Sequence, residues 1–441
     1  MQPRHYKQVG AFCYFYRMNI ETLYRVYLSC NKVCTDTRNI EKGDLFFALK
    51  GDRFNGNAFA AQALEQGASY AVVDESSYHT GEKTILTDDV LKTLQQLARF
   101  HRKQLALPIV ALTGSNGKTT TKELIYSVLS RKFRTVATKG NLNNHIGVPL
   151  TLLSMNRNTE MGIVEMGANH LGEIAALCTI AEPDYGYITN FGKAHLEGFG
   201  GIEGVIRGKS ELYQYLMQHE KLVFYNAGDH IQAEKLKDYP HTFGYDTTGN
   251  ADVAVTFLEA APFVRFRFKD EEISSALIGR YNFNNIAAAI TIGTYFDVPA
   301  GSIGEAIASY IPSDNRSQIV EKNGKKIVLD AYNANPSSMQ LAIENFTALP
   351  YPGKTMILGD MFELGGEADA EHQHIADLVA GLPGHSVLLV GEHFSRTQSA
   401  HPQFRDFESL RSHILEKGIP GKTFLIKGSR GMALERVLEL L

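Results

Sequence analysis

A glycine-bearing turn at residues 113–120 has the residue types of a phosphate-binding loop. It reads Thr-Gly-Ser-Asn-Gly-Lys-Thr-Thr, follows the apolar run 108–112 and precedes apolar residues at helical spacing. Backbone N–H groups of such a turn, at the start of a helix, can bind phosphate oxygens; Lys118 can reach the β- and γ-phosphates, and Thr119 can ligate Mg²⁺. The general pattern has another glycine where this chain has Leu112, so the match is to a shorter G-x-x-G-K-T form. The flanking strand and helix favour this interpretation over a glycine-rich turn without a ligand.

A carboxylate and an imidazole follow two further strand-like runs. Glu165 ends the run 162–165, and His195 follows the run 187–189 in a glycine-rich loop. Because open α/β sheets bind ligands at the carboxyl ends of their strands, both side chains could hold a metal ion beside the phosphates. Taken singly, a glutamate is more often a solvated charge and a histidine more often a packed residue. Lys209 lies in the predicted helix 202–216, where its local sequence indicates only a surface lysine.

The elements that must position these residues alternate between apolar runs and amphipathic stretches from about residue 35 onward. This alternation predicts an α/β fold with parallel sheets. The chain has 441 residues, about three times the ~150-residue prior for one domain, so two or three domains are expected. We predict boundaries that give a smaller domain over 18–105, a nucleotide-type domain over 106–312 and a second open α/β sheet over 313–441. Residues 1–17, which precede a second methionine, are predicted to be a dispensable extension.

Composition and charge exclude several classes of protein. Hydrophobic residues make up 44% and charged residues 21%, which excludes a mainly disordered, collagenous or coiled-coil chain. Lys and Arg total 44 against 48 Asp and Glu, so no bulk positive charge is available for nucleic acid or an anionic membrane. No run reaches the ~18 apolar residues of a spanning helix. Four cysteines fit neither a disulfide framework nor a C-x-x-C zinc pair, so a reducing, cytoplasmic compartment is expected.

The longer motifs and their order resemble the ATP-dependent Mur ligases of peptidoglycan synthesis, over nearly the whole chain from Met18. The stretches that carry this resemblance are 114–120, 141–149 (Asn-Leu-Asn-Asn-His-Ile-Gly-Val-Pro), 165–168 (Glu-Met-Gly-Ala) and 190–195. Four further stretches are similar to the members that add the dipeptide D-alanyl-D-alanine to UDP-N-acetylmuramoyl-tripeptide: 35–38, 330–339 (Asp-Ala-Tyr-Asn-Ala-Asn-Pro-Ser-Ser-Met), 358–365 and 427–432.

The resemblance implies a UDP-sugar-binding N-terminal domain, a central P-loop ATPase and a C-terminal Rossmann-like domain that closes over the site. It implies the use of ATP and two Mg²⁺ sites. Apart from the resemblance, we expect no nucleic acid and no membrane insertion, and we expect a monomer, although the sequence itself does not identify the oligomeric state. By position, the implied ATP contacts are Gly114, Ser115, Asn116, Gly117, Lys118, Thr119, Thr120, Asn282, Asn285, Arg316 and Asp330. The implied Mg²⁺ ligands are Thr119, Glu165, His195 and a carbamylated Lys209, and the implied catalytic residues are Lys118, Glu165, His195 and Lys209. The implied substrate contacts are Thr37, Arg38, Asn143, Asn144, Tyr332, Asn333 and Asn335.

Two positions depart from the family pattern, since the family usually has histidine where this chain has Tyr281, and often where it has Asn57. The implied reaction activates a carboxylate as an acyl phosphate, which the amine of the dipeptide then attacks. Two alternatives stay open: a ligase of the same architecture that adds a single amino acid or glutamate, and a nucleotide-binding regulator without turnover. The sequence identifies neither the third residue of the acceptor peptide nor the general base for the amine.

Overall fold

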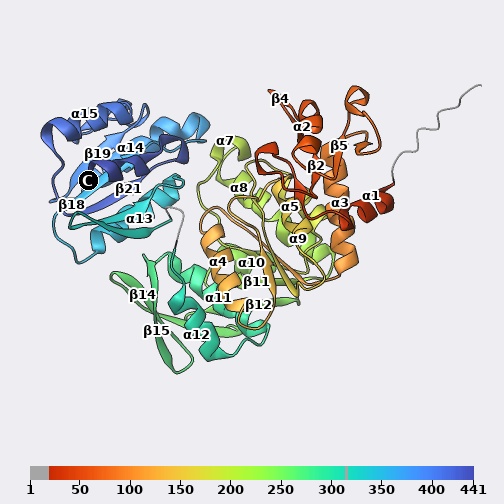
Figure 1. Ribbon diagram of the computed structural model, residues 1–441. Helices are drawn as coiled ribbons and strands as arrows, with labels where there is room; N and C mark the ends of the chain where they lie inside the picture. Colours follow the sequence, from red (N-terminus) through yellow and green to blue (C-terminus); the bar gives the residue numbers. More distant parts are fainter. Residues whose placement is uncertain (1–18, 313–315) are drawn as a thin grey trace, which may run out of the picture. The chain divides into compact units, whose positions relative to one another are not determined.

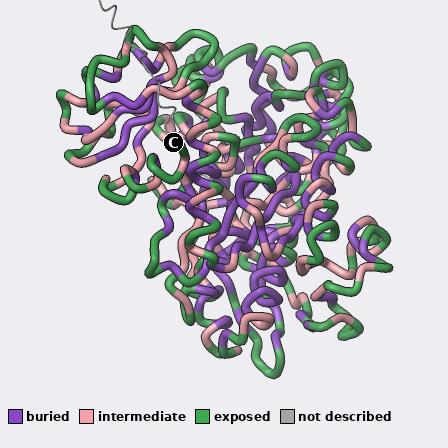
Figure 2. Tube along the Cα trace, turned by 90° about the vertical axis from the view of Figure 1, so that its right-hand side faces the viewer, coloured by how far each residue is buried: buried purple, intermediate pink, exposed green. Residues whose placement is uncertain are grey.

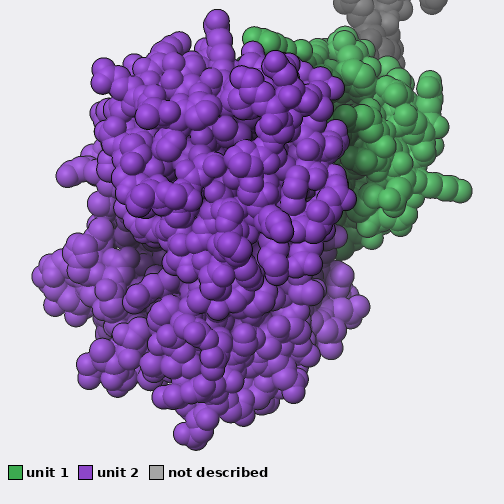
Figure 3. Space-filling view, turned by 90° about the vertical axis from the view of Figure 1, so that its left-hand side faces the viewer, with its two compact units in different colours: residues 1–104 green, residues 105–441 purple. Residues whose placement is uncertain are grey.

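The computed structural model describes residues 19–312 and 316–441. These residues form two compact units, one ending at Gln104 and the other beginning at Leu105 (Figure 3). The predicted extension 1–17 lies outside the described residues. Within the described ranges, no helix is both long and apolar enough to cross a membrane.

The first unit contains a four-stranded parallel sheet in the order β1-β2-β5-β6. The apolar run at 45–47 forms its buried strand β2, and the run Tyr-Ala-Val-Val at 70–73 forms β5. A short hairpin of β3 and β4 follows β2. The elements are α1 (Ile20–Leu28), β1 (Val33–Cys34), β2 (Leu45–Phe47), β3 (Lys50–Gly51), β4 (Phe54–Asn55), α2 (Ala60–Glu65), β5 (Tyr70–Val73), β6 (Thr84–Leu86) and α3 (Val90–Leu105).

The second unit contains two sheets, and the larger has nine strands in the order β15-β14-β13-β12-β11-β10-β7-β9-β8. All pairings from β8 to β13 are parallel, which confirms the predicted parallel-rich sheet. The strands are β7 (Ile109–Thr113), β8 (Thr135–Ala137), β9 (Met161–Glu165), β10 (Tyr185–Ile188), β11 (Leu222–Asn226), β12 (Thr242–Asp246), β13 (Val253–Ala260), β14 (Phe263–Phe268) and β15 (Glu271–Ile278). The helices of this region are α4 (Lys118–Leu129), α5 (Gly147–Leu153), α6 (Glu173–Ala181), α7 (Leu196–Phe199), α8 (Ile202–Lys209), α9 (Glu211–Gln218), α10 (His230–Leu236), α11 (Asn282–Tyr295) and α12 (Ala300–Ser309).

The prediction of α/β alternation throughout is wrong at β13–β15, which pair antiparallel (green in Figure 1). Buried and exposed residues alternate along β14, as expected for a sheet with one solvated face. The exposed side chains form ion pairs across the strands, for example Arg267 with Glu272 at 2.5 Å. This meander leads directly into α11, whose first residues line the cavity described below.

The second sheet of this unit has six strands in the order β16-β17-β21-β18-β19-β20, and it is parallel except for the edge strand β16. Its four interior strands coincide with the apolar runs at 326–329, 355–358, 387–390 and 423–426. Residues of these strands and of the helices packed on them are buried. Figure 2 colours the buried segments of the whole trace purple. The elements are β16 (Gln318–Lys322), β17 (Lys325–Asp330), α13 (Pro336–Ala348), β18 (Lys354–Gly359), α14 (Ala368–Ala380), β19 (Ser386–Val390), β20 (Gln403–Phe404), α15 (Phe407–Lys417) and β21 (Thr423–Lys427).

Candidate active site

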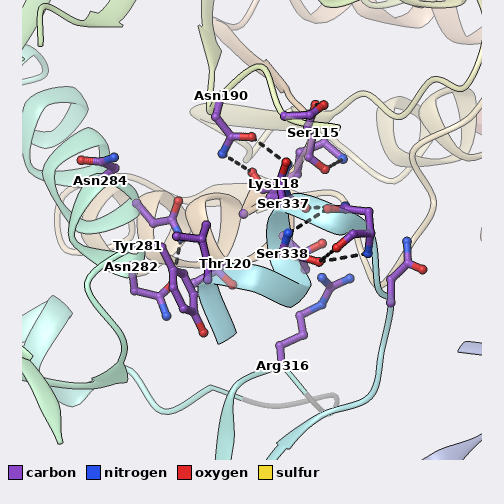
Figure 4. Close-up of a pocket in the computed structure, with 18 of the residues that line it drawn as sticks. Ser115, Lys118, Thr120, Asn190, Tyr281, Asn282, Asn284, Arg316, Ser337 and Ser338 are labelled. Atoms are coloured by element: carbon purple, nitrogen blue, oxygen red, sulfur yellow. Dashed lines mark hydrogen bonds between the residues drawn. The ribbon is translucent and has the colours of Figure 1, made fainter. Parts of the chain in front are cut away.

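One large cavity of about 1410 Å³ lies within the second unit (Figure 4). It brings together segments that are far apart in the sequence: the turn after β7, the ends of β9 and β10, the start of α11, and the start of α13. The predicted site residues that line it are Ser115, Asn116, Gly117, Lys118, Thr119, Thr120, Asn143, Asn144, Glu165, His195, Asn282, Asn285, Arg316, Asp330, Tyr332, Asn333 and Asn335. Gly114 and Lys209 are not among the lining residues.

The turn between β7 and α4 has the backbone of a phosphate cradle. Gly117, the residue before α4, has a φ of +79°, and a Cβ there would lie 2.6 Å from Asn285 Oδ1. Gly114 has a φ of +141°, and a Cβ there would lie 2.0 Å from Thr189 Oγ1. Both positions therefore require glycine, because of conformation and of close approach.

The end of β10 holds this turn in place. The Asn116 N–H donates to Asn190 Oδ1 at 3.0 Å, and the Asn190 amide donates back to the Asn116 carbonyl at 3.0 Å. The Thr189 hydroxyl donates to the same carbonyl at 2.6 Å. Because these bonds fix the backbone of the turn within the fold, the turn is preorganised before any ligand arrives.

Lys118 folds back over the turn and donates through Nζ to the carbonyls of Gly114 at 2.7 Å and Ser115 at 3.2 Å. Burial lowers the pKa of the Lys118 ammonium, and the charge of Glu165 opposes this effect. An anionic phosphate in the cavity would favour the charged ammonium further. Among the described residues, the hydrogen-bond acceptors of Lys118 Nζ are thus neutral carbonyls beside the cradle.

Glu165 at the end of β9 has the features of a cation ligand. Its side chain is buried, and Oε1 accepts from the Asn143 amide at 2.8 Å and from the Thr119 hydroxyl at 3.4 Å. Oε2 is buried and has no hydrogen-bond partner among residues 19–312 and 316–441. An unsatisfied buried carboxylate oxygen costs about 1–3 kcal/mol or more, and Mg²⁺ prefers carboxylate and hydroxyl oxygens. The side chains of Thr119 and Glu165 therefore fit a Mg²⁺ ion next to the phosphate cradle.

His195 precedes the short helix α7 with a φ of +53°. Its Nδ1 forms a hydrogen bond with Glu363 Oε2, from the segment between β18 and α14. This contact lowers the pKa of the Glu363 carboxyl. Since an ionised carboxylate only accepts, Nδ1 carries the proton and Nε2 is the nitrogen left for a cavity ligand.

Lys209 is completely buried, so the local indication of a surface lysine is wrong. The predicted helix 202–216 is divided at Ser210 into α8 and α9, and Lys209 is the last residue of α8. Its Nζ donates to the Ala168 carbonyl at 2.8 Å and lies 5.0 Å from the centre of the Phe199 ring. Burial, and then the charge of Lys118, lower the pKa of Lys209 well below the usual value, which favours the neutral amine.

The start of α11 contributes the other wall. Asn285 donates to Asn282 Oδ1 at 2.8 Å and accepts from the Thr121 hydroxyl at 3.0 Å, and its side chain packs against Gly117 of the glycine turn. Tyr281, where the family usually has histidine, is also ordered by a contact: its hydroxyl lies 2.6 Å from Ser317 Oγ. Figure 4 shows Tyr281 and Asn282 side by side at this edge of the cavity.

Residues after 315 supply a cationic and aromatic group. The Arg316 guanidinium lies 3.7 Å from the centre of the Tyr332 ring, and its Nε is buried with no hydrogen-bond partner in the part of the chain that the structure describes. Asp330 is held by Lys427, whose buried Nζ donates to Asp330 Oδ2 at 2.7 Å and to the Asn333 carbonyl at 3.1 Å. Arg316 therefore keeps an unused donor for an anionic ligand at the cavity.

Asn335 and Asn144 have local structural roles in addition to lining the cavity. Asn335 caps α13, accepting from the Ser338 N–H at 2.9 Å, and its amide donates to Asn116 Oδ1 at 2.7 Å. Asn144 accepts from the Gly147 N–H at 2.9 Å at the start of α5.

In the first unit, Arg38 is exposed and forms a bidentate ion pair with Asp36, at 2.6 Å between Nη2 and Oδ2, with Thr37 between them. This pairing lowers the pKa of the Asp36 carboxyl to about 2. Asn57, where histidine is common in the family, is completely buried and donates to Asp74 Oδ1 at 2.8 Å. Its side chain is therefore occupied within the fold.

Sequence reasoning missed several residues that position the site. Asn190, Glu363, Lys427 and Ser337 are named only as members of longer motifs, and Ser317 is assigned no role. The signal that could have identified Glu363 and Lys427 is a charged residue within a motif at the end of a buried strand. Their partners lie 97 to 168 positions away, so the pairings themselves are invisible in the sequence.

Comparisons with known proteins agree with this geometry. Three family models match the chain: the "Mur ligase family, catalytic domain" over residues 30–102, the "Mur ligase middle domain" over 112–293, and the "Mur ligase, glutamate ligase domain" over 315–436. The matched ranges contain the glycine turn, Glu165 and His195 in the middle model, and Arg316 and Asp330 in the last.

Similarity to individual proteins extends over nearly the full length. The UDP-N-acetylmuramoyl-tripeptide–D-alanyl-D-alanine ligase of Bacillus subtilis is 33% identical, with 92% of each chain covered. The enzyme of the same name from Escherichia coli is 32% identical, with 94% of each covered. Among solved structures, MurF from Acinetobacter baumannii has a TM-score of 0.84 at 30% identity, covering 95% of this chain and 97% of that one. MurF ligase from Thermotoga maritima in complex with ADP has a TM-score of 0.81 at 28% identity, covering 94% and 97%. The phosphate cradle and the buried Glu165 carboxylate agree with this similarity over nearly the full length. The chain therefore belongs to the Mur ligase family.

Proposed function

We propose that this protein is an ATP-dependent ligase that joins D-alanyl-D-alanine to UDP-N-acetylmuramoyl-tripeptide, giving the pentapeptide precursor of peptidoglycan. The observation that carries the proposal is the cavity, in which the glycine turn, Lys118, Glu165 and Arg316 meet at one place. The choice of substrates is supported by the names of the relatives that cover nearly the whole chain.

The proposed reaction has two steps. The terminal carboxylate of the tripeptide attacks the γ-phosphorus of ATP, the bond to the β-phosphate oxygen breaks, and ADP leaves with that electron pair. The dipeptide amine, after losing a proton, then attacks the acyl carbon, and inorganic phosphate leaves as the amide forms. ATP is needed because a free carboxylate is a poor acyl donor, whereas phosphate is a competent leaving group.

The residues of the cavity divide this work by their chemistry. The backbone N–H groups at 117–119 bind phosphate oxygens, since those of Ser115 and Asn116 already donate to Asn190. The Lys118 ammonium and the Arg316 guanidinium stabilise the charge that spreads over the transferring phosphoryl group. Thr119 and Glu165 would hold Mg²⁺, which neutralises phosphate charge when bound. His195, through Nε2, is the proposed additional ligand.

A second metal site is proposed at Lys209 after carbamylation. Carbon dioxide reacts with a neutral amine, and burial favours that form of Lys209. The product is an anion with two oxygens, and Glu173 and Glu211 are the acidic groups whose charges act on this site.

Removal of carbon dioxide should lower the turnover rate about 10-fold or more, with bicarbonate restoring it. The proposal would be contradicted if the measured mass of an active enzyme corresponded to an unmodified Lys209, or if Lys209→Ala kept full activity.

The substrate contacts are proposed from position in the cavity and in the family motifs. Asn143 and Asn144 line the cavity beside Glu165, and Tyr332, Asn333 and Asn335 line it beside Arg316. Thr37 and Arg38 of the first unit are proposed to contact the UDP-sugar.

We also propose a cytoplasmic monomer with domains at 18–105, 106–312 and 313–441. Cell fractionation would test the localisation, gel filtration the oligomeric state, and limited proteolysis the domain boundaries.

The decisive experiment measures phosphate release from the purified protein with Mg-ATP, omitting each substrate in turn. Release should require both UDP-N-acetylmuramoyl-tripeptide and D-alanyl-D-alanine, and the product should be heavier by the dipeptide. Release with a single amino acid in place of the dipeptide would identify a related ligase. No release under any combination, with bicarbonate present, would favour a regulator that binds nucleotide without turnover.

A further inference from the structure

The loop that follows β10 is held by side chains from a different part of the second unit. The Lys193 N–H donates to Ser337 Oγ at 2.9 Å, and Lys193 Nζ forms an ion pair with Glu371 at 2.5 Å. Two residues further on, His195 Nδ1 bonds to Glu363. Three contacts within three residues of loop fix its course against α13, α14 and the segment after β18.

The backbone makes the contact between His195 and Glu363 specific. The Glu197 N–H donates to the Glu363 carbonyl at 3.3 Å, so the two segments are in register beside the two side chains. Gly365, with a φ of +55°, lets the segments approach, since a Cβ there would lie 3.0 Å from Glu197 Cβ. Apolar residues of α7 and of the segment 361–364 belong to the same buried cluster.

The two ends of the His195 ring are therefore in different surroundings. Nδ1 is taken by the Glu363 carboxylate, while the residue itself lines the cavity next to the glycine turn. A carboxylate that accepts from one imidazole nitrogen fixes the tautomer and ring orientation, and it makes the other nitrogen a better ligand.

We propose that Glu363 is a positioning residue, which accepts from His195 Nδ1 and so directs Nε2 at the ligand site of the cavity. The inference rests on the proposed function for its effect on turnover. Because Glu363 and His195 come from segments 168 positions apart in the sequence, the imidazole is oriented only while those two segments are in contact. The contact with Glu363 therefore determines whether His195 Nε2 is oriented to bind a ligand in the cavity.

The test compares Glu363→Ala with Glu363→Gln and with Glu367→Ala. The glutamine retains a carbonyl oxygen that can accept from Nδ1–H, whereas alanine has none. Glu367 is an exposed acid four residues away in the same segment, and its side chain forms no hydrogen bond or ion pair with the described residues. Three quantities are measured for each variant. The first is the kcat and KM for ATP, and the second is the affinity for Mn²⁺ of protein that already holds ADP. The third is the set of ¹⁵N NMR signals of His195, which are assigned by their loss in His195→Gln.

Glu363→Ala should lower kcat and weaken Mn²⁺ binding about 10- to 100-fold, and shift the His195 signals from the Nδ1–H tautomer toward a mixture. The KM for ATP should change little, and Glu363→Gln should recover most of the loss in both kcat and the NMR signature. Glu367→Ala should behave like the wild type in all measurements.

Unchanged His195 signals in Glu363→Ala would overturn the inference, whatever happens to activity. It would also be overturned if Glu363→Gln were as impaired as Glu363→Ala. Failure of the proposed function is distinguishable, because the wild type would then lack turnover while the Mn²⁺ and NMR measurements would still report on Glu363.

Discussion

At the scale of single residues, the glycine turn has no room for a side chain at Gly117. Gly117→Ala places a Cβ 2.6 Å from Asn285 Oδ1, in a backbone conformation with positive φ. We expect the variant to fold with a loss of about 1–2 kcal/mol of stability, and to bind ATP at least about 10-fold more weakly because the cradle must shift. Isothermal titration with ADP, together with urea unfolding, would measure the two effects separately.

Gly172 offers the matched control for this prediction. It also precedes a helix, α6, with a φ of +85°, but a Cβ there meets nothing within 4 Å. Gly172→Ala should therefore show a similar loss of stability with unchanged ADP affinity. Equal affinities in the two variants would mean that the contact with Asn285 has no role in binding.

Single residues also show where sequence reasoning succeeds and where it fails. Lys118 and Thr119 could be assigned from spacing, because a strand, a turn and a helix fix the cradle locally. The burial of Lys209 could not, because it depends on Phe199, Ala168 and the packing of α8, which no local pattern encodes. Glu363 was equally hidden, because its partner lies 168 residues away.

At the scale of elements, α13 connects its own cap to the phosphate cradle through Asn335. Asn335→Ala should destabilise the protein by about 1 kcal/mol through loss of the cap and raise the KM for ATP severalfold through loss of the donor to Asn116. Asn335→Asp keeps the cap but cannot donate to Asn116 Oδ1, so it should raise the KM without the loss of stability.

Helix α15 provides the control, because Asp406 and Ser409 form the same type of capping box as Asn335 and Ser338. Asp406→Ala should lose similar stability and leave the KM for ATP unchanged. A rise in KM in Asp406→Ala would show that general destabilisation, and not the contact with Asn116, sets the KM.

A second element-scale prediction concerns the histidine that joins β18 to α14. His372 is completely buried, lies 2.6 Å from the Ala368 carbonyl through Nδ1, and accepts from the Met361 N–H at 3.0 Å. Burial lowers its pKa, partly offset by that carbonyl and by Asp360. The unfolded chain binds a proton near pH 6.5 while the folded chain does not, so stability should fall below that pH by up to about 1.4 kcal/mol per unit.

Urea unfolding at pH 7.5, 6.0 and 5.0 would measure this slope. His372→Gln should reduce it, because the glutamine can accept from Met361 without titrating. His374→Gln, at an exposed position of the same helix, should retain the wild-type slope. A slope that persists in His372→Gln would assign the pH dependence to other groups.

Elements were predictable where the chain obeys βα alternation, as at β5 and at the four interior strands of the six-stranded sheet. The antiparallel meander β13–β15 was not, although burial alternates along β14 with a period of two. Such alternation is typical of a half-exposed strand, but it does not specify the partner or the direction of pairing. Similarly, nothing in the sequence at 202–216 indicates the division at Ser210.

At the scale of the whole molecule, the two compact units should respond differently to nucleotide, because every residue that lines the cavity belongs to the second unit. Calorimetry of the full chain should resolve two transitions. ADP at about 100 times its Kd should stabilise one of them by about 2.7 kcal/mol, raising its midpoint by about 4 °C given the size of that unit, and leave the other unchanged. Gly117→Ala should reduce the shift, since it weakens ADP binding without altering the first unit. A single transition, or equal shifts of both, would contradict the expectation that the second unit binds nucleotide by itself.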